Sequence, residues 1–541
     1  LATPHSSWST GQNLKKIQLT YPTLRATGSM VEMCAALQPL WESGSTEDAH
    51  RHAEVLTEHI NTHGVRTLMS ERILEALLDK LKSKKHAEDR ERAAIGLGAI
   101  ASKVAGKNAP LPLGAEPWLI PAIAPLLETY ADKNEKVKQA AESAMASIVP
   151  LFPPEAAAEL LDVLYGVIMS STAKWQAKVG ALKIIGRLAD LAYEQVGDEL
   201  TQMTPVLTQA MHETKAEVSK QAIKTATKVC GVIDNNDIRP FIPDLVGCMA
   251  RPDSVPACIK KLSPITFVAE VTGPALAVMV PLLSRALNER SQTVQRQSVI
   301  IVDNLCKLVR DPHTAALYLP GLLPSVERIE EGASFPEVRE HAKSAVHTLR
   351  TAFAAADASK QDPQGTDPLA RLAEARSKAL QRLADAVQPR VPTGVVFSAL
   401  GDAFTRTGLE YVSRVVVRLA DKRIVQAEPW NDVYVLPYLR RVCETTEGAQ
   451  NATNLLREEY EKLDFERFGK PEDDGSELDG EKLCDTIFSL AYGGLLLLNH
   501  TRLRLYRGRR YGIVAANGSG KSTLLKAMRD GKVEGLSLIH I

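Results

Sequence analysis

The sequence predicts a mainly α-helical chain in which stacked helix pairs come first, a helical bundle follows, and the start of an α/β domain comes last. Three observations lead to this prediction. The chain has 541 residues, which is long for one domain. Apolar residues make up 45% of it and aromatic residues only 5%, a balance more typical of stacked helices than of a β-sandwich. A segment with helical spacing also recurs along much of its length.

Charge and cysteine content exclude several classes of protein. Lys plus Arg equals Asp plus Glu at 65 each, so neither a strongly basic nucleic-acid-binding chain nor an acidic disordered tail describes the whole. The seven cysteines are scattered without a CxxC pair, which predicts reduced core residues and a cytoplasmic protein. The longest apolar stretches are well short of the ~18–20 residues that a membrane span needs, so we expect no membrane partner.

The repeat predicts the architecture of the first part of the chain. Each copy has an apolar and often a basic residue, then a small or apolar residue one helical turn later, and the copies start 36 to 48 residues apart. This is the period of HEAT helix pairs, which cannot bury their apolar stripes alone and stack into an α-solenoid. An unrelated helical array is the alternative. The copies start at Asp89, Val137, Ala177, Val218, Cys258, Val294 and Val338, and prolines between them are expected to separate the helices.

The boundaries follow from changes in this pattern. Residues 1–29 show neither helical periodicity nor a targeting pattern, and we interpret them as a non-native leader before a HEAT-repeat solenoid over 30–355. Residues 367–463 predict a four-helix bundle, with helical stretches at 369–387, 394–405, 409–421 and 433–463. The acidic stretch 464–485 fits a solvated linker better than a metal site. The last residues, 536–541, are interpreted as a truncation scar.

Two groups of lysines could contact phosphates. One comprises Lys80, Lys82, Lys84 and Lys85, and the other Lys215, Lys220, Lys224 and Lys228. Solvated helix faces explain either group alone. Binding to a nucleic-acid backbone would need several such groups on the same face.

A phosphate-binding loop is predicted near the end of the chain. The apolar run 511–514 is expected to form a strand that enters a glycine loop and then a helix from Thr523 to about Arg529. The glycines let backbone N–H groups surround a phosphate, Lys521 would bind the β- and γ-phosphates of ATP, and the Ser522 hydroxyl would ligate Mg²⁺. The predicted contacts are Ala515, Asn517, Gly518, Ser519, Gly520, Lys521, Ser522 and Thr523, with Ala515 at a position that usually holds glycine.

Tyr492 is a second candidate for nucleotide binding. It precedes Lys521 by 29 residues, and an aromatic ring on an incoming strand can stack on adenine. An ordinary core tyrosine explains its position equally well.

Several stretches together resemble one family, namely 174–186, 267–272, 279–290, 303–309 and 483–493. With the phosphate loop, they make Met30 to Gly535 similar to the N-terminal half of fungal-type translation elongation factor 3, a ribosome-associated ATPase of the ABC superfamily. The resemblance implies that 486–535 is the truncated start of an α/β ABC ATPase cassette and that Tyr492 stacks on adenine.

The resemblance also implies a function. Full-length members bind and hydrolyse ATP to promote release of deacylated tRNA from the ribosomal exit site. Partners would be ribosomal RNA and proteins, exit-site tRNA and elongation factor 1A. The Walker B carboxylates, signature motif and switch histidine would follow Gly535, so we expect no catalytic residue in this chain and no ATPase activity from it alone. The alternative is a non-enzymatic HEAT-repeat scaffold that binds ribosomes or a kinase. Lys521 and Ser522 argue against this alternative, because a scaffold does not need a phosphate-binding loop.

Overall fold

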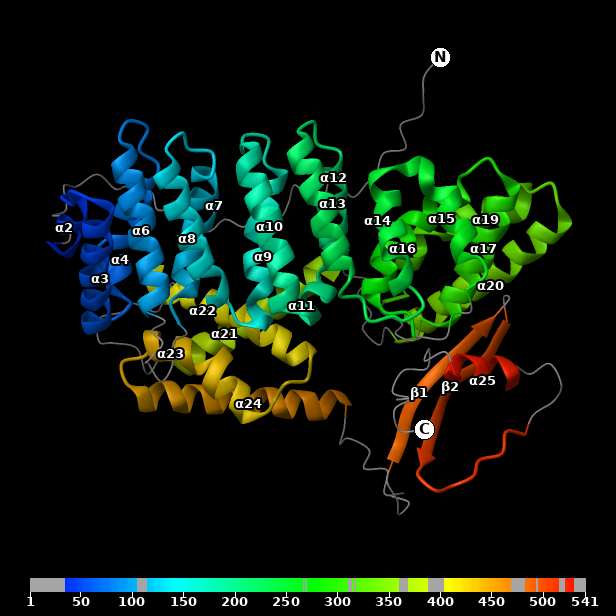
Figure 1. The fold of residues 1–541 in the computed structure, drawn as a ribbon. Helices are drawn as coiled ribbons and strands as arrows, with labels where there is room; N and C mark the ends of the chain where they lie inside the picture. Colours follow the sequence, from blue (N-terminus) through cyan, green and yellow to red (C-terminus); the bar gives the residue numbers. More distant parts are fainter. Residues whose placement is uncertain are drawn as a thin grey trace. The chain divides into compact units, whose positions relative to one another are not determined.

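The computed structural model is mainly helical, with one antiparallel strand pair (Figure 1). It describes residues 35–104, 114–265, 267, 270–309, 314–315, 318–359, 368–387, 403–468, 482–492, 495–514 and 521–529. The chain divides into two compact units, residues 1–148 with 398–408, and residues 149–397 with 409–541. The predicted leader 1–29 and scar 536–541 lie outside the described residues.

The first unit is an array of short and long helices. Its helices of four residues or more are α2 (Gln38–Trp41), α3 (Thr46–His63), α4 (Thr67–Ser70), α5 (Ile73–Leu81), α6 (Ala87–Val104), α7 (Glu116–Thr129) and α8 (Glu135–Ile148). The first turn of α22 (Ala403–Asp421), up to Gly408, also belongs to this unit.

The second unit continues the same kind of array. Its solenoid helices are α9 (Ala157–Met169), α10 (Trp175–Leu191), α11 (Tyr193–Asp198), α12 (Leu200–Met211), α13 (Ala216–Cys230), α14 (Ile242–Ala250), α15 (Val255–Leu262), α16 (Gly273–Leu287), α17 (Gln292–Lys307), α19 (Leu323–Gly332) and α20 (Pro336–Ser359). Equivalent helices of successive repeats pack side by side, as α10 does with α13 and α17 with α20 (Figure 1).

The repeat segment explains why the helices stack. All seven copies lie in helices, namely α6, α8, α10, α13, α15, α17 and α20. The small residue that follows the start of a copy by one turn is fully buried, as for Ala141, Ala181 and Ala222, each 0% exposed. A small side chain there lets neighbouring helices approach closely, and the apolar residue one turn earlier fills the core. The HEAT-type solenoid that the sequence predicts is therefore present in the described residues.

Not every proline separates two helices. Pro205 lies inside α12 and Pro281 inside α16, where the sequence predicts a boundary. Pro205 is the sixth residue of α12 and Pro281 the ninth of α16, so each removes a backbone N–H that would otherwise donate within its helix.

Within the described residues, four helices and a short π-helical segment follow the solenoid. They are α21 (Pro368–Val387), the rest of α22, η9 (Pro429–Tyr434), α23 (Leu436–Val442) and α24 (Thr446–Phe468). The predicted stretch 394–405 lies mostly outside the described residues, and the predicted stretch 409–421 is the continuation of α22. The predicted break near Gly448 occurs a few residues earlier, between α23 and α24.

Two long strands follow the helices. Strands β1 (Lys482–Tyr492) and β2 (Leu495–Tyr506) pair antiparallel, with Tyr492 opposite Leu495 at the turn. Of the predicted linker 464–485, residues 464–468 belong to α24 and 482–485 to β1, and 469–481 lie outside the described residues. None of the described helices is both long and apolar enough to cross a membrane.

Candidate functional site

The predicted phosphate loop leads into a helix. Helix α25 (Lys521–Arg529) begins at Lys521, so Lys521 and Ser522 stand in its first turn, where backbone N–H groups have no partner within the helix. The Lys521 side chain is half-buried and that of Ser522 is exposed. Residues 515–520, and with them Ala515, Asn517, Gly518, Ser519 and Gly520, lie outside the described residues. The position of Lys521 and Ser522 is the one that phosphate binding at a helix N-terminus requires.

The strand expected just before this loop is absent from the described residues. Residues 511–514 have no regular secondary structure, and Val514 is 97% exposed. A strand needs a neighbour for its backbone hydrogen bonds, and within the described part of the chain β1 and β2 pair with each other. The prediction of a strand at 511–514 was therefore wrong for this structure. Instead, the Tyr511 hydroxyl accepts a hydrogen bond from the Tyr506 backbone N–H at 2.7 Å.

The other predicted contacts stay predictions. Tyr492 ends β1, and Thr523 lies in the first turn of α25, but the side chains of both lie outside the described residues. The described residues contain no group of three His, Cys, Asp or Glu side chains able to hold a metal ion. The predicted Mg²⁺ ligand, Ser522, would need the phosphates of the nucleotide as further ligands.

Only part of the first lysine group is available to contact phosphates. The Lys80 ammonium is 3.0 Å from the Asp89 carboxylate and lies 5.5 Å from the centre of the Trp41 ring. Lys82, Lys84 and Lys85 are exposed between α5 and α6. The four lysines therefore do not act as one cluster.

The second lysine group gains cations from a neighbouring helix. Lys220 and Lys224 are exposed on α13, whereas Lys228 pairs with Asp190 of α10. Helix α10 adds Lys183 and Arg187, both exposed. Sequence reasoning missed these two because they come from the previous repeat.

An ion-pair network fixes α22 to the solenoid of the second unit. Arg414 pairs with Glu159, and Arg418 with Glu199 at 2.5 Å. Lys422 lies 3.5 Å from the Glu155 carboxylate. The carboxylates of Glu155, Glu159 and Glu199 are at most 9% exposed. Buried charges of this kind are stable only when paired, so the three pairs specify where α22 docks.

Asp162 stands in the same network with an altered pKa. Desolvation, helped by the nearby charges of Glu159 and Glu199, raises the pKa of Asp162 to about 7, although Arg376 and Arg414 oppose the shift. Among the described residues the network has five carboxylates and four cations, so carboxylates outnumber cations in it. Its members are Glu155, Glu159, Asp162, Asp198, Glu199, Arg376, Arg414, Arg418 and Lys422.

The sequence contained a signal for this network. Glu159 and Asp162 interrupt an otherwise apolar helix. Arg414 and Arg418 on α22, and Lys422 directly after it, recur at four-residue intervals. Acids on an apolar face and bases at helical spacing indicate a buried pairing surface. The spacing alone did not identify the partner.

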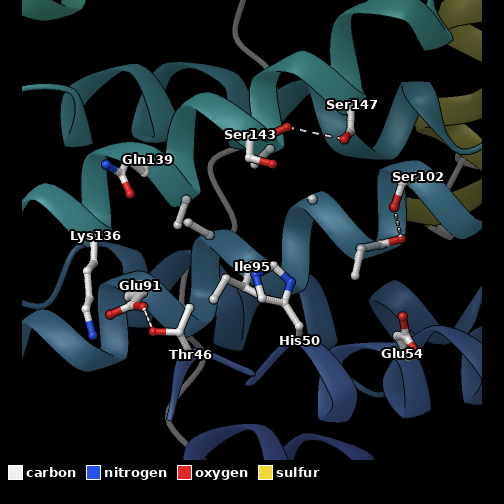
Figure 2. A pocket seen from close by; sticks show the side chains of 15 residues that line it. Thr46, His50, Glu54, Glu91, Ile95, Ser102, Lys136, Gln139, Ser143 and Ser147 are labelled. Carbon is white, nitrogen blue, oxygen red and sulfur yellow. Dashed lines mark hydrogen bonds between the residues drawn. The ribbon is translucent and has the colours of Figure 1, made fainter. Parts of the chain in front are cut away.

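A trough of about 550 Å³ lies over α3, α6 and α8 of the first unit (Figure 2). The Thr46 hydroxyl donates to Glu91 at 2.7 Å, Ser102 donates to the Ala99 carbonyl, and Ser147 to the Ser143 carbonyl. Its lining also includes the small residues Ala94, Gly98, Ala140 and Ala144. These three hydroxyl groups therefore already donate to protein acceptors.

Comparison with known proteins identifies the repeats. The model of the "EF3 N-terminal HEAT repeat" matches residues 49–226, and that of the "Elongation factor 3/GNC1 HEAT repeat" matches residues 254–360. Both matches fall within the solenoid described above.

Curated relatives match over most of the chain. The mRNA export factor elf1 of Schizosaccharomyces pombe is 38% identical over 478 residues, which is 88% of this chain and 43% of that protein. Elongation factor 3 of Zygosaccharomyces rouxii is 37% identical over 456 residues, 83% of this chain and 41% of its own length. Elongation factor 3 of Gonapodya prolifera is 34% identical over 519 residues, 94% of this chain and 45% of its own.

The chain thus spans less than half the length of these relatives, and what it shares with them is above all the HEAT region. No catalytic domain is evident in the part of the chain that the structure describes. On the family models, the relatives and the solenoid together, the chain belongs to the elongation factor 3-like HEAT-repeat proteins.

Proposed function

We propose that the chain is part of a ribosome-associated, cytoplasmic ATPase that uses ATP to promote release of deacylated tRNA from the exit site. The observation that supports this most directly is the position of Lys521 and Ser522 in the first turn of α25, after the glycine-containing sequence 515–520. Residues 486–535 would be the start of an ABC cassette, with Tyr492 stacked on adenine. Residues 367–463 would form a bundle that joins this cassette to the HEAT solenoid 30–355, with 464–485 as linker.

ATP and Mg²⁺ would bind at this segment. Backbone N–H groups at the start of α25 and the Lys521 ammonium would hold the phosphates, and the Ser522 hydroxyl would contribute one Mg²⁺ ligand. ATP binding and hydrolysis would change the cassette, and the fixed docking of α22 on α9 and α11 would transmit that change to the solenoid. The partners would be ribosomal RNA and proteins, exit-site tRNA and elongation factor 1A.

A related function has a specific observation in its favour. The relative at 38% identity is named as an mRNA export factor, not as an elongation factor. That name concerns mRNA, so an ATPase that acts on an mRNA–protein particle is the second candidate. A scaffold without ATPase activity is the third, and the Lys521–Ser522 pair at a helix start argues against it.

The test uses the product of the whole transcript that encodes this chain. With translating ribosomes, it should hydrolyse ATP and speed the release of labelled deacylated tRNA, while a non-hydrolysable ATP analogue should not support repeated release. Lys521→Ala should weaken ATP binding about 10–100-fold, because a charge-assisted contact to phosphate contributes about 1.5–3 kcal/mol.

Lys526→Ala is the matched control, since Lys526 is an exposed lysine one turn later on α25. It should bind and hydrolyse ATP like the wild type. If the wild-type product hydrolyses no ATP, both ATPase candidates are refuted and the scaffold function remains. ATP hydrolysis stimulated by mRNA–protein particles but not by ribosomes would favour the second candidate.

A further inference from the structure

Helices α10 and α13 of the second unit lie side by side and share one face. The Thr225 hydroxyl on α13 donates to the Leu182 carbonyl on α10 at 2.9 Å. A Cβ atom on Gly186 would lie 3.8 Å from that same hydroxyl oxygen. This close approach places the exposed side chains of the two helices next to one another.

That face presents four cations without ion-pair partners. They are Lys183 and Arg187 on α10 and Lys220 and Lys224 on α13, all exposed. None of them makes an ion pair or a side-chain hydrogen bond with the described residues. On each helix the two cations are four residues apart, or about 6 Å along the axis. We call these four residues the α10–α13 strip.

The surrounding charges set the strip apart. At one end Lys178 pairs with Glu213, and at the other Lys228 pairs with Asp190. Glu217, exposed at the start of α13, is a further carboxylate nearby. In another repeat, by contrast, Arg296 of α17 pairs with Glu337 of α20. The strip therefore concentrates positive charge that its neighbours do not neutralise.

We propose that the α10–α13 strip binds the phosphate backbone of RNA. Two rows of cations, about 8–10 Å apart as packed helices are, can contact successive phosphates without reading bases. An acidic protein partner fits less well, because protein interfaces need a buried apolar or aromatic centre and Ile223, 36% exposed, is the apolar residue among these cations on α13. The choice of RNA as the polyanion rests on the proposed function, whereas the location rests on the charges.

The experiment measures binding of a labelled RNA hairpin to this chain, without ATP, over a series of salt concentrations. The strip variant combines Lys183→Gln, Arg187→Gln, Lys220→Gln and Lys224→Gln. The control variant loses four exposed cations elsewhere, through Lys133→Gln, Arg251→Gln, Lys260→Gln and Lys343→Gln. Circular dichroism checks that both variants keep the wild-type helix content.

The strip variant should bind RNA at least tenfold more weakly at low salt, and its slope of log affinity against log salt should fall by about 3. The control variant should lose much less of both. Equal losses in the two variants would overturn the proposal, since net charge alone would then explain them. Displacement of the RNA by polyglutamate at equal charge would also overturn it, in favour of an acidic protein partner. The RNA-binding experiment contains no ATP, so its result is independent of ATPase activity. If the chain binds RNA through the strip but the full-length protein hydrolyses no ATP, only the proposed function is refuted.

Discussion

Trp118 and Phe404 are 286 residues apart in the sequence, yet their rings stack with centroids 4.1 Å apart and planes inclined by 2°. The Trp118 indole N–H also donates to the Phe404 carbonyl oxygen at 3.0 Å. Both side chains are at most 1% exposed, and the Arg66 guanidinium lies 4.8 Å from the centre of the Phe404 ring. The start of α22 is thus built into the core of the first unit.

Phe404→Ala should destabilise the first unit by about 3–5 kcal/mol, because it removes a buried ring and leaves a cavity. Phe404→Leu keeps apolar volume, loses the aromatic stacking of about 0.5–1.5 kcal/mol, and should cost clearly less. The measurement is amide hydrogen exchange of α7, since a chain with two units need not unfold in one step. Unchanged exchange of α7 in Phe404→Ala would contradict the packing described here.

The Arg414–Glu159 pair should behave as a buried ion pair. Arg414→Met alone should cost about 3–5 kcal/mol, because the buried carboxylate of Glu159, 2% exposed, would lose its ion pair. Arg414→Met combined with Glu159→Met should cost much less than the sum of the single changes. Denaturant unfolding followed by hydrogen exchange of α22 gives this double-mutant cycle. Additive losses would show that the two side chains do not interact.

Asp162 should make the stability of the second unit depend on pH. Its pKa rises from 3.8 to about 7 in the folded chain, so the folded state binds the proton more tightly than the unfolded state does. The stability due to this group is therefore largest below about pH 4 and falls as the pH rises toward about 7.

Asp162→Asn removes this dependence. Relative to the wild type, the variant should gain stability between about pH 4 and pH 7 and keep a constant advantage above that range. The groups that face Asp162 and could modify the effect are Glu159, Tyr165, Glu199, Arg376, Arg414 and Arg418. Unfolding midpoints from pH 4.5 to pH 8.5 test it, with Glu217→Gln as a control that removes one exposed carboxylate. Parallel pH profiles for Asp162→Asn and the wild type would refute the assignment.

The sequence predicts the solenoid well because its information is local and repeated. The four-residue spacing between Val137 and Ala141 recurs in later repeats, so the pattern of one helix pair predicts the next. The docking of α22 depends instead on pairs such as Arg418 with Glu199, which are separated by 219 residues. A periodic sequence pattern does not predict contacts between residues so far apart. The strand predicted at 511–514 failed for a related reason, because a strand forms only beside a neighbour and no local pattern supplies one. The helix predicted from Thr523 is present because that signal is local too, although α25 begins two residues earlier, at Lys521.

The buried small residue of each repeat offers the sharpest test of the solenoid packing. Ala222 on α13 is 0% exposed, and Ala216 at the start of the same helix is exposed. Ala222→Leu should destabilise the second unit by about 1–3 kcal/mol, because the larger side chain must push neighbouring helices apart. Ala216→Leu introduces the same side chain on the same helix into solvent and should change stability by less than about 0.5 kcal/mol. The comparison is made by thermal unfolding of the two variants. If both lose equal stability, helix propensity rather than close packing explains the small residue, and the spacing of the repeat has another cause.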